Sequence, residues 1–434
     1  MAHATPLLVL DSGLLLRRVL EIIPGLLVWG TLIGLTILGF TNPLAVAVFL
    51  ILYDFYWLVR ALYVATHLVA SYRTLRLMRG VDWLARLRSL DDPRRALATV
   101  ETRLRDAERT VATASGDARR MAKKTLRQER RFRADLLQLQ ASGNQRPTNI
   151  PRWDDLLHVV ILSTYREPLA LLQQSLDALG TAAYPKERLW VVVTLEERAG
   201  EHAVAVQDAL QKRYANSFGR FLTTVHPDGI PGERQVKSAN ASYAARTVQK
   251  LIDAESIPYE HVLISNFDSD TVASPEYFGA LTYTYLVTPD RLRCSYQPLP
   301  FYHNNLWEAP AFTRVISTNS TFWILIQFAK WERMVTYSSH AMPFRALVDV
   351  GFWDPTAVSE DSRIFWQCYA YYEGNYRVVP LYATVSMDVT RAPTLFQTFV
   401  HQYKQKRRWA WGIENFPFIV QTFLKRSAIP VKER

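Results

Sequence analysis

The chain begins with an apolar stretch that is long enough to cross a bilayer. From Ile22 to Phe40 no charged residue occurs over about 19 positions, which is close to the length of a membrane-spanning helix. A cleaved signal peptide is the alternative. It is disfavoured because no small-residue cleavage site follows and a second apolar stretch begins almost at once.

The second apolar stretch runs from Pro43 to about Ala70 and is interrupted by Asp54 and Arg60. Charges within a membrane segment are costly, so an interfacial helix is an alternative for its second half. We predict a membrane region over residues 1–80, with helices at about 20–40 and 43–70.

Arginines flank both outer ends of this region. Arg17 and Arg18 precede the first helix, while Arg73, Arg76 and Arg79 follow the second. Positive residues favour the cytoplasmic side, so both ends are predicted to be cytoplasmic. The sequence therefore indicates an integral membrane protein with a cytoplasmic domain.

Between residues 93 and 140 the apolar positions recur at heptad spacing in two runs, separated at Ser115–Asp117. Asp92-Pro93 is a typical start for the first of two helices. We predict an antiparallel helical hairpin within a unit spanning residues 81–150, followed by a linker from Pro147 to Pro151.

From about residue 156 the pattern changes to short apolar runs rich in β-branched residues, with helix-like segments between them. The runs are LHVVILST, LWVVVTLEE, FLTTVHP and HVLISNFD. Strands that alternate with helices predict a parallel sheet, here assigned to a domain over residues 151–415. Residues 320–334 fit either an interfacial helix or a buried core helix, and residues 416–434 are predicted to form an interfacial tail.

The charge of the chain is concentrated in one segment. Of the formal net charge of +11, residues 73–150 contribute +10, from 19 Arg/Lys and 9 Asp/Glu. Contact with anionic membrane lipids, contact with a partner, and a simply solvated face all fit this segment. Nucleic-acid binding is disfavoured because no recognition motif or interleaved aromatic residues accompany the charge. The two cysteines, Cys294 and Cys368, are predicted to be free thiols.

Asp268-Ser269-Asp270 directly follows the fourth apolar run. Ligands of parallel sheets bind beyond the carboxyl ends of the strands. Two carboxylates at such a position can hold a divalent cation, since Mg²⁺ and Mn²⁺ prefer oxygen ligands and keep positions open for phosphate. A turn without function is the alternative for this motif alone.

Two further motifs carry candidate chemistry. In Ser359-Glu360-Asp361 a carboxylate could accept a proton from a hydroxyl, although a helix start capped by Ser359 explains the same pattern. In the segment QKRRW at residues 405–409, the fork of Arg408 suits a diphosphate and Trp409 suits a sugar face.

In this order the three motifs resemble the processive branch of family-2 glycosyltransferases, such as the cellulose and hyaluronan synthases. The motifs of that family are D-x-D, T-E-D and Q-x-x-R-W, and the resemblance covers about residues 156–415. It implies a Rossmann-like α/β catalytic domain of the GT-A fold with a mostly parallel sheet, to which the transmembrane helix pair and the hairpin are added.

The resemblance extends to the donor site. Ser163–Pro168 resembles the family loop that holds the nucleotide base, and Lys237–Asn240 resembles a helix start whose lysine approaches the diphosphate. The family's Asp-Asp-Gly after the second strand is replaced by Glu196-Glu197-Arg198, which puts the base identity in doubt. The implied donor residues are Thr164, Tyr165, Glu167, Glu196, Lys237, Asp268 and Arg408.

The implied activity is an inverting transfer from a nucleotide-diphosphate sugar, with a UDP-sugar favoured. The acceptor would be a polysaccharide or lipid-linked, and Asp268 and Asp270 would bind Mg²⁺ or Mn²⁺. Asp361 would be the general base, and Gln405 and Trp409 would contact the acceptor. Trp307 is a weaker candidate for sugar stacking.

The alternative is a catalytically degenerate membrane scaffold that binds a partner through the hairpin, although all the motif acids are retained. Two membrane helices cannot enclose a polysaccharide, so the chain is a fragment, transfers without translocation, or oligomerises.

Overall fold

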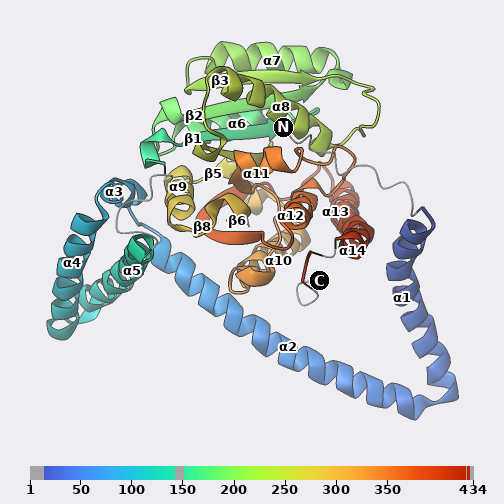
Figure 1. The fold of residues 1–434 in the computed structure, drawn as a ribbon. Coiled ribbons are helices and arrows are strands. Elements are labelled where there is room, and N and C mark those ends of the chain that lie inside the picture. The colour runs from blue at the N-terminus through green and yellow to red at the C-terminus, as the bar shows by residue number, and fades with distance from the viewer. Residues whose placement is uncertain (1–13, 142–150, 427, 431–434) are drawn as a thin grey trace.

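Two long helices extend away from the α/β domain in the computed structural model, which describes residues 14–141, 151–426 and 428–430. Helices α1 (Leu14–Thr41) and α2 (Pro43–Met78) meet at Asn42 and diverge towards the domain, as Figure 1 shows. The side chain of Asn42 caps α2 by accepting a hydrogen bond from the Ala45 N–H (3.2 Å), and proline suits the first helical position.

Both helices are long and apolar enough to cross a membrane. Their most hydrophobic 18-residue windows have mean hydropathies of 2.0 and 1.8, and neither window is buried in the protein. Both helices extend beyond the predicted bounds at their outer ends. Near the domain, α1 contacts α14 (Asn415–Lys425) and α2 packs on α10 (Ala311–Phe328). The apolar windows of both helices therefore lie outside the core of the domain.

A helical hairpin joins α2 to the sheet. It consists of α4 (Pro93–Thr113) and α5 (Gly116–Ala141), preceded by the short α3 (Trp83–Ser89). Its inner end packs on α9 (Tyr277–Val287), where Asp135 accepts a hydrogen bond from the Tyr283 hydroxyl (2.7 Å). Gln128 donates to the carbonyl of Leu77 in the last turn of α2, and Lys124 donates to the carbonyl of Arg79 just after it. The hairpin is thus fixed to both α2 and the domain.

The domain is built on one eight-stranded mixed sheet with the order β3-β2-β1-β4-β7-β6-β8-β5. The neighbours among β3, β2, β1 and β4 are parallel, as are β6 and β8, whereas β7 is antiparallel to both of its neighbours and β5 is antiparallel to β8. The four predicted strands are β1, β2, β3 and β4, which form one parallel half of the sheet. The strands are β1 (Leu157–Ser163), β2 (Leu189–Glu196), β3 (Arg220–His226), β4 (Val262–Asp268), β5 (Val272–Ala273), β6 (Cys294–Tyr302), β7 (Ala341–Pro343) and β8 (Arg377–Met387).

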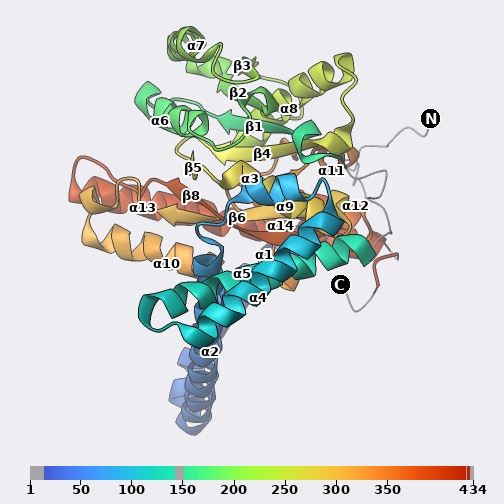
Figure 2. The same ribbon diagram turned by 90° about the vertical axis from the view of Figure 1, so that its left-hand side faces the viewer.

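Helices cover both faces of this sheet (Figures 1 and 2). One core layer packs α3, α5, α6, α7 and α9 against the sheet, and the other packs α8, α10, α11 and α12. Both cysteines are free and buried. The remaining helices are α6 (Leu169–Gly180), α7 (Glu201–Tyr214), α8 (Lys237–Ala254), α11 (Phe344–Asp349), α12 (Glu360–Tyr371) and α13 (Leu395–Ala410).

Two expectations for the surface helices need adjustment. The helix predicted at 320–334 begins earlier, as α10 at Ala311, and it is neither fully buried nor fully exposed: Leu325 packs in the core while Phe322 is exposed. Of the predicted tail, α14 packs against α1 and α12. Residues 431–434 and most of the predicted linker before Pro151 lie outside the described residues.

Candidate active site

A cleft of about 960 Å³ lies at the carboxyl ends of the parallel strands. Its walls come from the loops after β1, β2 and β4, from the start of α8 and α12, and from α10 and α13. Ligands of open α/β sheets bind at this edge, and the volume suits a ligand larger than a single sugar.

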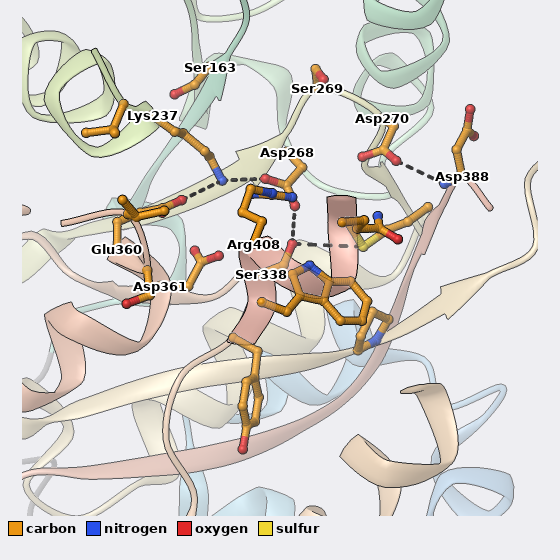
Figure 3. A pocket seen from close by; sticks show the side chains of 18 of the residues that line it. Ser163, Lys237, Asp268, Ser269, Asp270, Ser338, Glu360, Asp361, Asp388 and Arg408 are labelled. Atoms are coloured by element: carbon orange, nitrogen blue, oxygen red, sulfur yellow. Dashed lines mark hydrogen bonds and ion pairs between the residues drawn. The ribbon is translucent and has the colours of Figure 1, made fainter. Parts of the chain in front are cut away.

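Lys237 connects the two sides of the cleft. Its ammonium donates to Asp268 at the end of β4 and lies 3.2 Å from Glu360 at the start of α12. Figure 3 shows the lysine between the two carboxylates. The other oxygen of Asp268 accepts a hydrogen bond from Ser338. Segments more than 100 residues apart are therefore held together by one buried charge network.

The charged groups of this network shift one another's pKa values. Burial by itself would lower the pKa of Lys237, but Asp268, Asp361 and Glu360 together raise it. Burial opposes ionisation of Asp268, yet Lys237 outweighs it and lowers the pKa of Asp268 to about 2. Burial, with the neighbouring Asp361, raises the pKa of Glu360 to about 7. A cluster with more carboxylates than cations favours a ligand or ion that brings positive charge.

Asp270 completes the D-x-D motif on the opposite wall. Its carboxylate accepts a hydrogen bond from the backbone N–H of Asp388 (3.0 Å), as drawn in Figure 3. Burial, followed by repulsion from Asp268, raises the pKa of Asp270 to about 7. A divalent cation would relieve this repulsion, so the donor set fits Mg²⁺ or Mn²⁺ held by two carboxylates and a diphosphate. Within the described residues no group of three His, Cys, Asp or Glu side chains is placed to hold a metal.

Asp361 lies on the first turn of α12 and lines the cleft. Its Oδ1 atom is buried, has no hydrogen-bond partner among the described residues, and lies 3.5 Å from Nδ1 of His340, which is fully buried just before β7. Helix α12 begins after Ser359 with Glu360 and Asp361 in its first turn, as the helix-start alternative predicted. The hydroxyl of Ser359 does not bond to this turn but donates to Glu414 (2.7 Å), so it ties α12 to the segment after α13.

Helix α13 brings the third motif to the cleft. Figure 3 places the guanidinium of Arg408 next to Asp268. Trp409 also lines the cleft, with its ring centroid 6.5 Å from that of Tyr302. Gln405 reaches the cleft too, but its side-chain oxygen already accepts a hydrogen bond from Thr390 (2.9 Å). Trp307 does not line the cleft and is 82% exposed, so its predicted role in this site is wrong.

The loop after β1 forms the other end of the cleft. Glu167 accepts hydrogen bonds from the Thr164 hydroxyl (2.8 Å) and the Tyr165 N–H (2.6 Å), which fixes the loop. Glu196 lies here as predicted, but its carboxylate is paired with Arg198. The guanidinium of Arg198 in turn lies 4.0 Å from the centre of the Tyr165 ring.

Apart from Trp307, the predicted site residues all line this one cleft: Thr164, Tyr165, Glu167, Glu196, Lys237, Asp268, Asp270, Asp361, Gln405, Arg408 and Trp409. Their individual roles stay predictions. Sequence reasoning missed Arg198, Glu360, Asp388 and Ser338. Glu360 and Arg198 lie inside motifs that the sequence singled out, so their positions carried a signal, whereas Ser338 is brought in only by the fold.

Comparison with known proteins agrees with this geometry. Residues 263–431 match the model of glycosyl transferase family group 2. The predicted resemblance to family-2 glycosyltransferases is thereby confirmed over the part of the domain from β4 to α14, which contains all three motifs. The match does not distinguish the processive branch. No curated protein sequence matches the chain.

Several solved glycosyltransferase structures resemble the chain at low identity. The mannosyltransferase PcManGT from Pyrobaculum calidifontis, in complex with GDP-Man and Mn²⁺, is 15% identical, with 63% of this chain and 72% of that chain covered and a TM-score of 0.39. TarS 1-349 from S. aureus in complex with UDP-GlcNAc is 12% identical, with 56% and 61% covered and a TM-score of 0.33. GalNAc-T7 with UDP, GalNAc and Mn²⁺ is 9% identical, with 59% and 48% covered and a TM-score of 0.33. Similarity at this level carries no conclusion about the substrate of this chain.

Proposed function

We propose that the chain is a membrane-bound, inverting glycosyltransferase that moves a sugar from a nucleotide-diphosphate sugar to a polysaccharide or lipid-linked acceptor. The observation that supports this best is the convergence of Asp268, Asp270, Asp361 and Arg408, with Lys237, on one cleft at the sheet edge. The cleft offers carboxylates for a cation, cations for a diphosphate, and a carboxylate free to accept a proton.

The donor would lie with its base near Tyr165 and its diphosphate near Lys237 and Arg408. Asp268 and Asp270 would hold Mg²⁺ or Mn²⁺, which neutralises the charge that develops on the diphosphate. Lys237 and Arg408 add positive charge on the same leaving group. A UDP-sugar remains the favoured donor, although the pairing of Glu196 with Arg198 makes the base contacts differ from those of the resembled family.

The acceptor hydroxyl would attack the anomeric carbon from the side of Asp361. The new C–O bond forms as the bond to the diphosphate breaks, the leaving oxygen keeps the electron pair, and the hydroxyl proton passes to the carboxylate of Asp361, which lines the cleft. A single direct displacement inverts the anomeric carbon.

The membrane helices would place this reaction at the cytoplasmic surface. The support is the apolar surface of α1 and α2 together with the arginines at their outer ends. Binding of the basic hairpin to anionic lipids is supported only by the positive charge of the hairpin.

Screening of nucleotide sugars with the purified full chain tests the proposal. With Mn²⁺ or Mg²⁺ present, one sugar nucleotide should release its nucleoside diphosphate, and Asp361→Asn should abolish most of this release. Absence of metal-dependent nucleotide binding across UDP-, GDP- and ADP-sugars would instead favour a degenerate scaffold.

A further inference from the structure

The cleft contains a cation that the proposed donor chemistry does not use. Lys406 of α13 lines the cleft, donates to the Ser320 hydroxyl of α10 (3.4 Å), and lies 3.9 Å from the centre of the Trp409 ring. Burial lowers the pKa of Lys406. Among the residues that the structure describes, no carboxylate lies within ion-pair distance of it. A partly desolvated cation without a counter-ion favours an anionic ligand group.

Lys406 belongs to a different part of the cleft from the diphosphate cations. Arg408 is the cation of α13 that acts on Asp268, together with Lys237. The neighbours of Lys406 are instead a hydroxyl of α10 and the indole of the predicted acceptor residue Trp409. The anion that suits Lys406 is therefore on the acceptor side of the cleft.

The rim of this part of the cleft is apolar. Trp323 of α10 lines the cleft and is 47% exposed, and the same helix exposes Val315 and Phe322. Helix α13 lies alongside, with the ring of Phe399 6.1 Å from that of Phe312, and it exposes Phe396, Phe399 and Tyr403. Of these side chains Trp323 lines the cleft itself, and the others are exposed on the two helices beside it. Exposed apolar side chains beside a binding cleft indicate a site for an apolar ligand or surface.

This rim faces the same side of the molecule as the apolar helices. Helix α10 packs directly on α2, and Lys330 just after α10 lies 4.0 Å from the centre of the Tyr63 ring of α2. In Figures 1 and 2, α10 lies between the sheet and the path of α2. An acceptor that extends from Lys406 over this rim would reach the surface of the molecule at which the apolar part of α2 begins.

We propose that the acceptor is a lipid whose sugar is attached through a phosphate, with the phosphate bound by Lys406 and the lipid chain lying on the rim formed by α10 and α13. This inference rests on the proposed function and narrows it. A neutral polysaccharide would leave Lys406 without a counter-ion and would gain nothing from Phe322 and Phe399. A lipid phosphate satisfies both features at once.

The test measures binding of farnesyl phosphate to the full chain in detergent, against farnesol and inorganic phosphate as the two partial ligands. Farnesyl phosphate should bind at least about tenfold more tightly than either, the effect of one charge-assisted contact. Lys406→Gln should remove most of that preference, and Lys406→Arg should keep it. Lys404→Gln is the matched control, because Lys404 is an exposed lysine on the same helix outside the cleft.

Binding of UDP with Mn²⁺ to the same variants separates this inference from the proposed function. Unchanged UDP binding in Lys406→Gln, with loss of farnesyl phosphate binding, supports an acceptor-side phosphate. Weaker UDP binding with unchanged farnesyl phosphate binding would assign Lys406 to the donor and overturn the inference. Equal affinity for farnesol would overturn the phosphate contact, and equal affinity for inorganic phosphate would overturn the lipid site. Failure to bind any nucleotide would count against the proposed function itself, whatever the lipid result.

Discussion

Asp361 and Asp270 line the same cleft, yet their surroundings predict that substitution of Asp361 impairs sugar transfer and substitution of Asp270 impairs nucleotide binding. Asp361→Asn keeps the side-chain size and removes the proton acceptor, so transfer should fall by at least ~100-fold while metal-dependent nucleotide binding stays almost intact. Asp270→Asn removes a metal ligand, so nucleotide binding should weaken and excess Mn²⁺ should partly restore it. Nucleotide titration and single-turnover transfer measure the two effects separately.

Loss of nucleotide binding in Asp361→Asn, with normal transfer per bound donor, would contradict the assignment of the base. A parallel fall in unfolding temperature and both activities would mean that Asp361 is only structural.

His158 on β1 predicts a pH dependence of stability that is independent of catalysis. The ring is fully buried, Nε2 lies 2.7 Å from the Thr282 hydroxyl, and burial lowers the pKa of His158 from 6.5 to about 3. Because the folded pKa is the lower one, the unfolded chain binds the extra proton between pH 6.5 and 3. Stability from this group therefore falls as the pH falls through that window, by about 2 kcal/mol between pH 7 and 5.

Chemical denaturation of the protein in detergent at pH 7 and 5 checks this value. His158→Gln should reduce the pH dependence by about the same 2 kcal/mol. Identical pH dependence in both proteins would show that His158 does not determine the response.

At the scale of elements, the docking of the hairpin predicts a local effect of one substitution. Phe132 of α5 is 2% exposed, its ring lies 6.0 Å from that of Tyr283, and the Arg86 guanidinium lies 4.9 Å from its centre. Phe132→Ala should cost about 3–5 kcal/mol of local stability. Hydrogen exchange should become faster in α4 and α5 while β1 and β4 keep their protection. Met121→Ala, at a 63% exposed position on the same helix, is the control.

Elements with a strong local pattern were predictable, and contacts between distant segments were not. Strands β1, β2 and β4 are long runs of mostly buried apolar residues, so their type followed from composition. Strand β7 has three residues, and so short a strand leaves no periodic signal. Lys237 of α8 pairs with Glu360 of α12 across the fold. This contact could not be predicted from the sequence around either residue. The prediction for Trp307 was wrong because an aromatic side chain does not by itself indicate whether its residue lies in the cleft.

At the scale of the molecule, the two apolar helices predict a topology that cysteine labelling can measure. Cys294 and Cys368 are buried, so an introduced cysteine is the accessible one. Phe40→Cys, at the turn between α1 and α2, should react with a membrane-impermeant maleimide from outside intact cells. Ser115→Cys, at the hairpin tip, should react only after permeabilisation. Labelling of Ser115→Cys in intact cells would place the domain on the other side.

The length of α2 has a consequence for how the molecule tolerates change. Its 36 residues span about 54 Å, whereas the hydrocarbon core of a bilayer is about 30 Å thick. If α2 crosses the bilayer as proposed, the part beyond it remains helical and ends bonded to α5, so it would work as a rigid spacer that sets the distance of the cleft from the membrane surface. One inserted residue would raise the domain by about 1.5 Å and rotate it by about 100°. Only insertions close to whole helical turns would keep α10 facing the bilayer surface. Length variation should therefore be rare within this helix and more common in the loops of the domain.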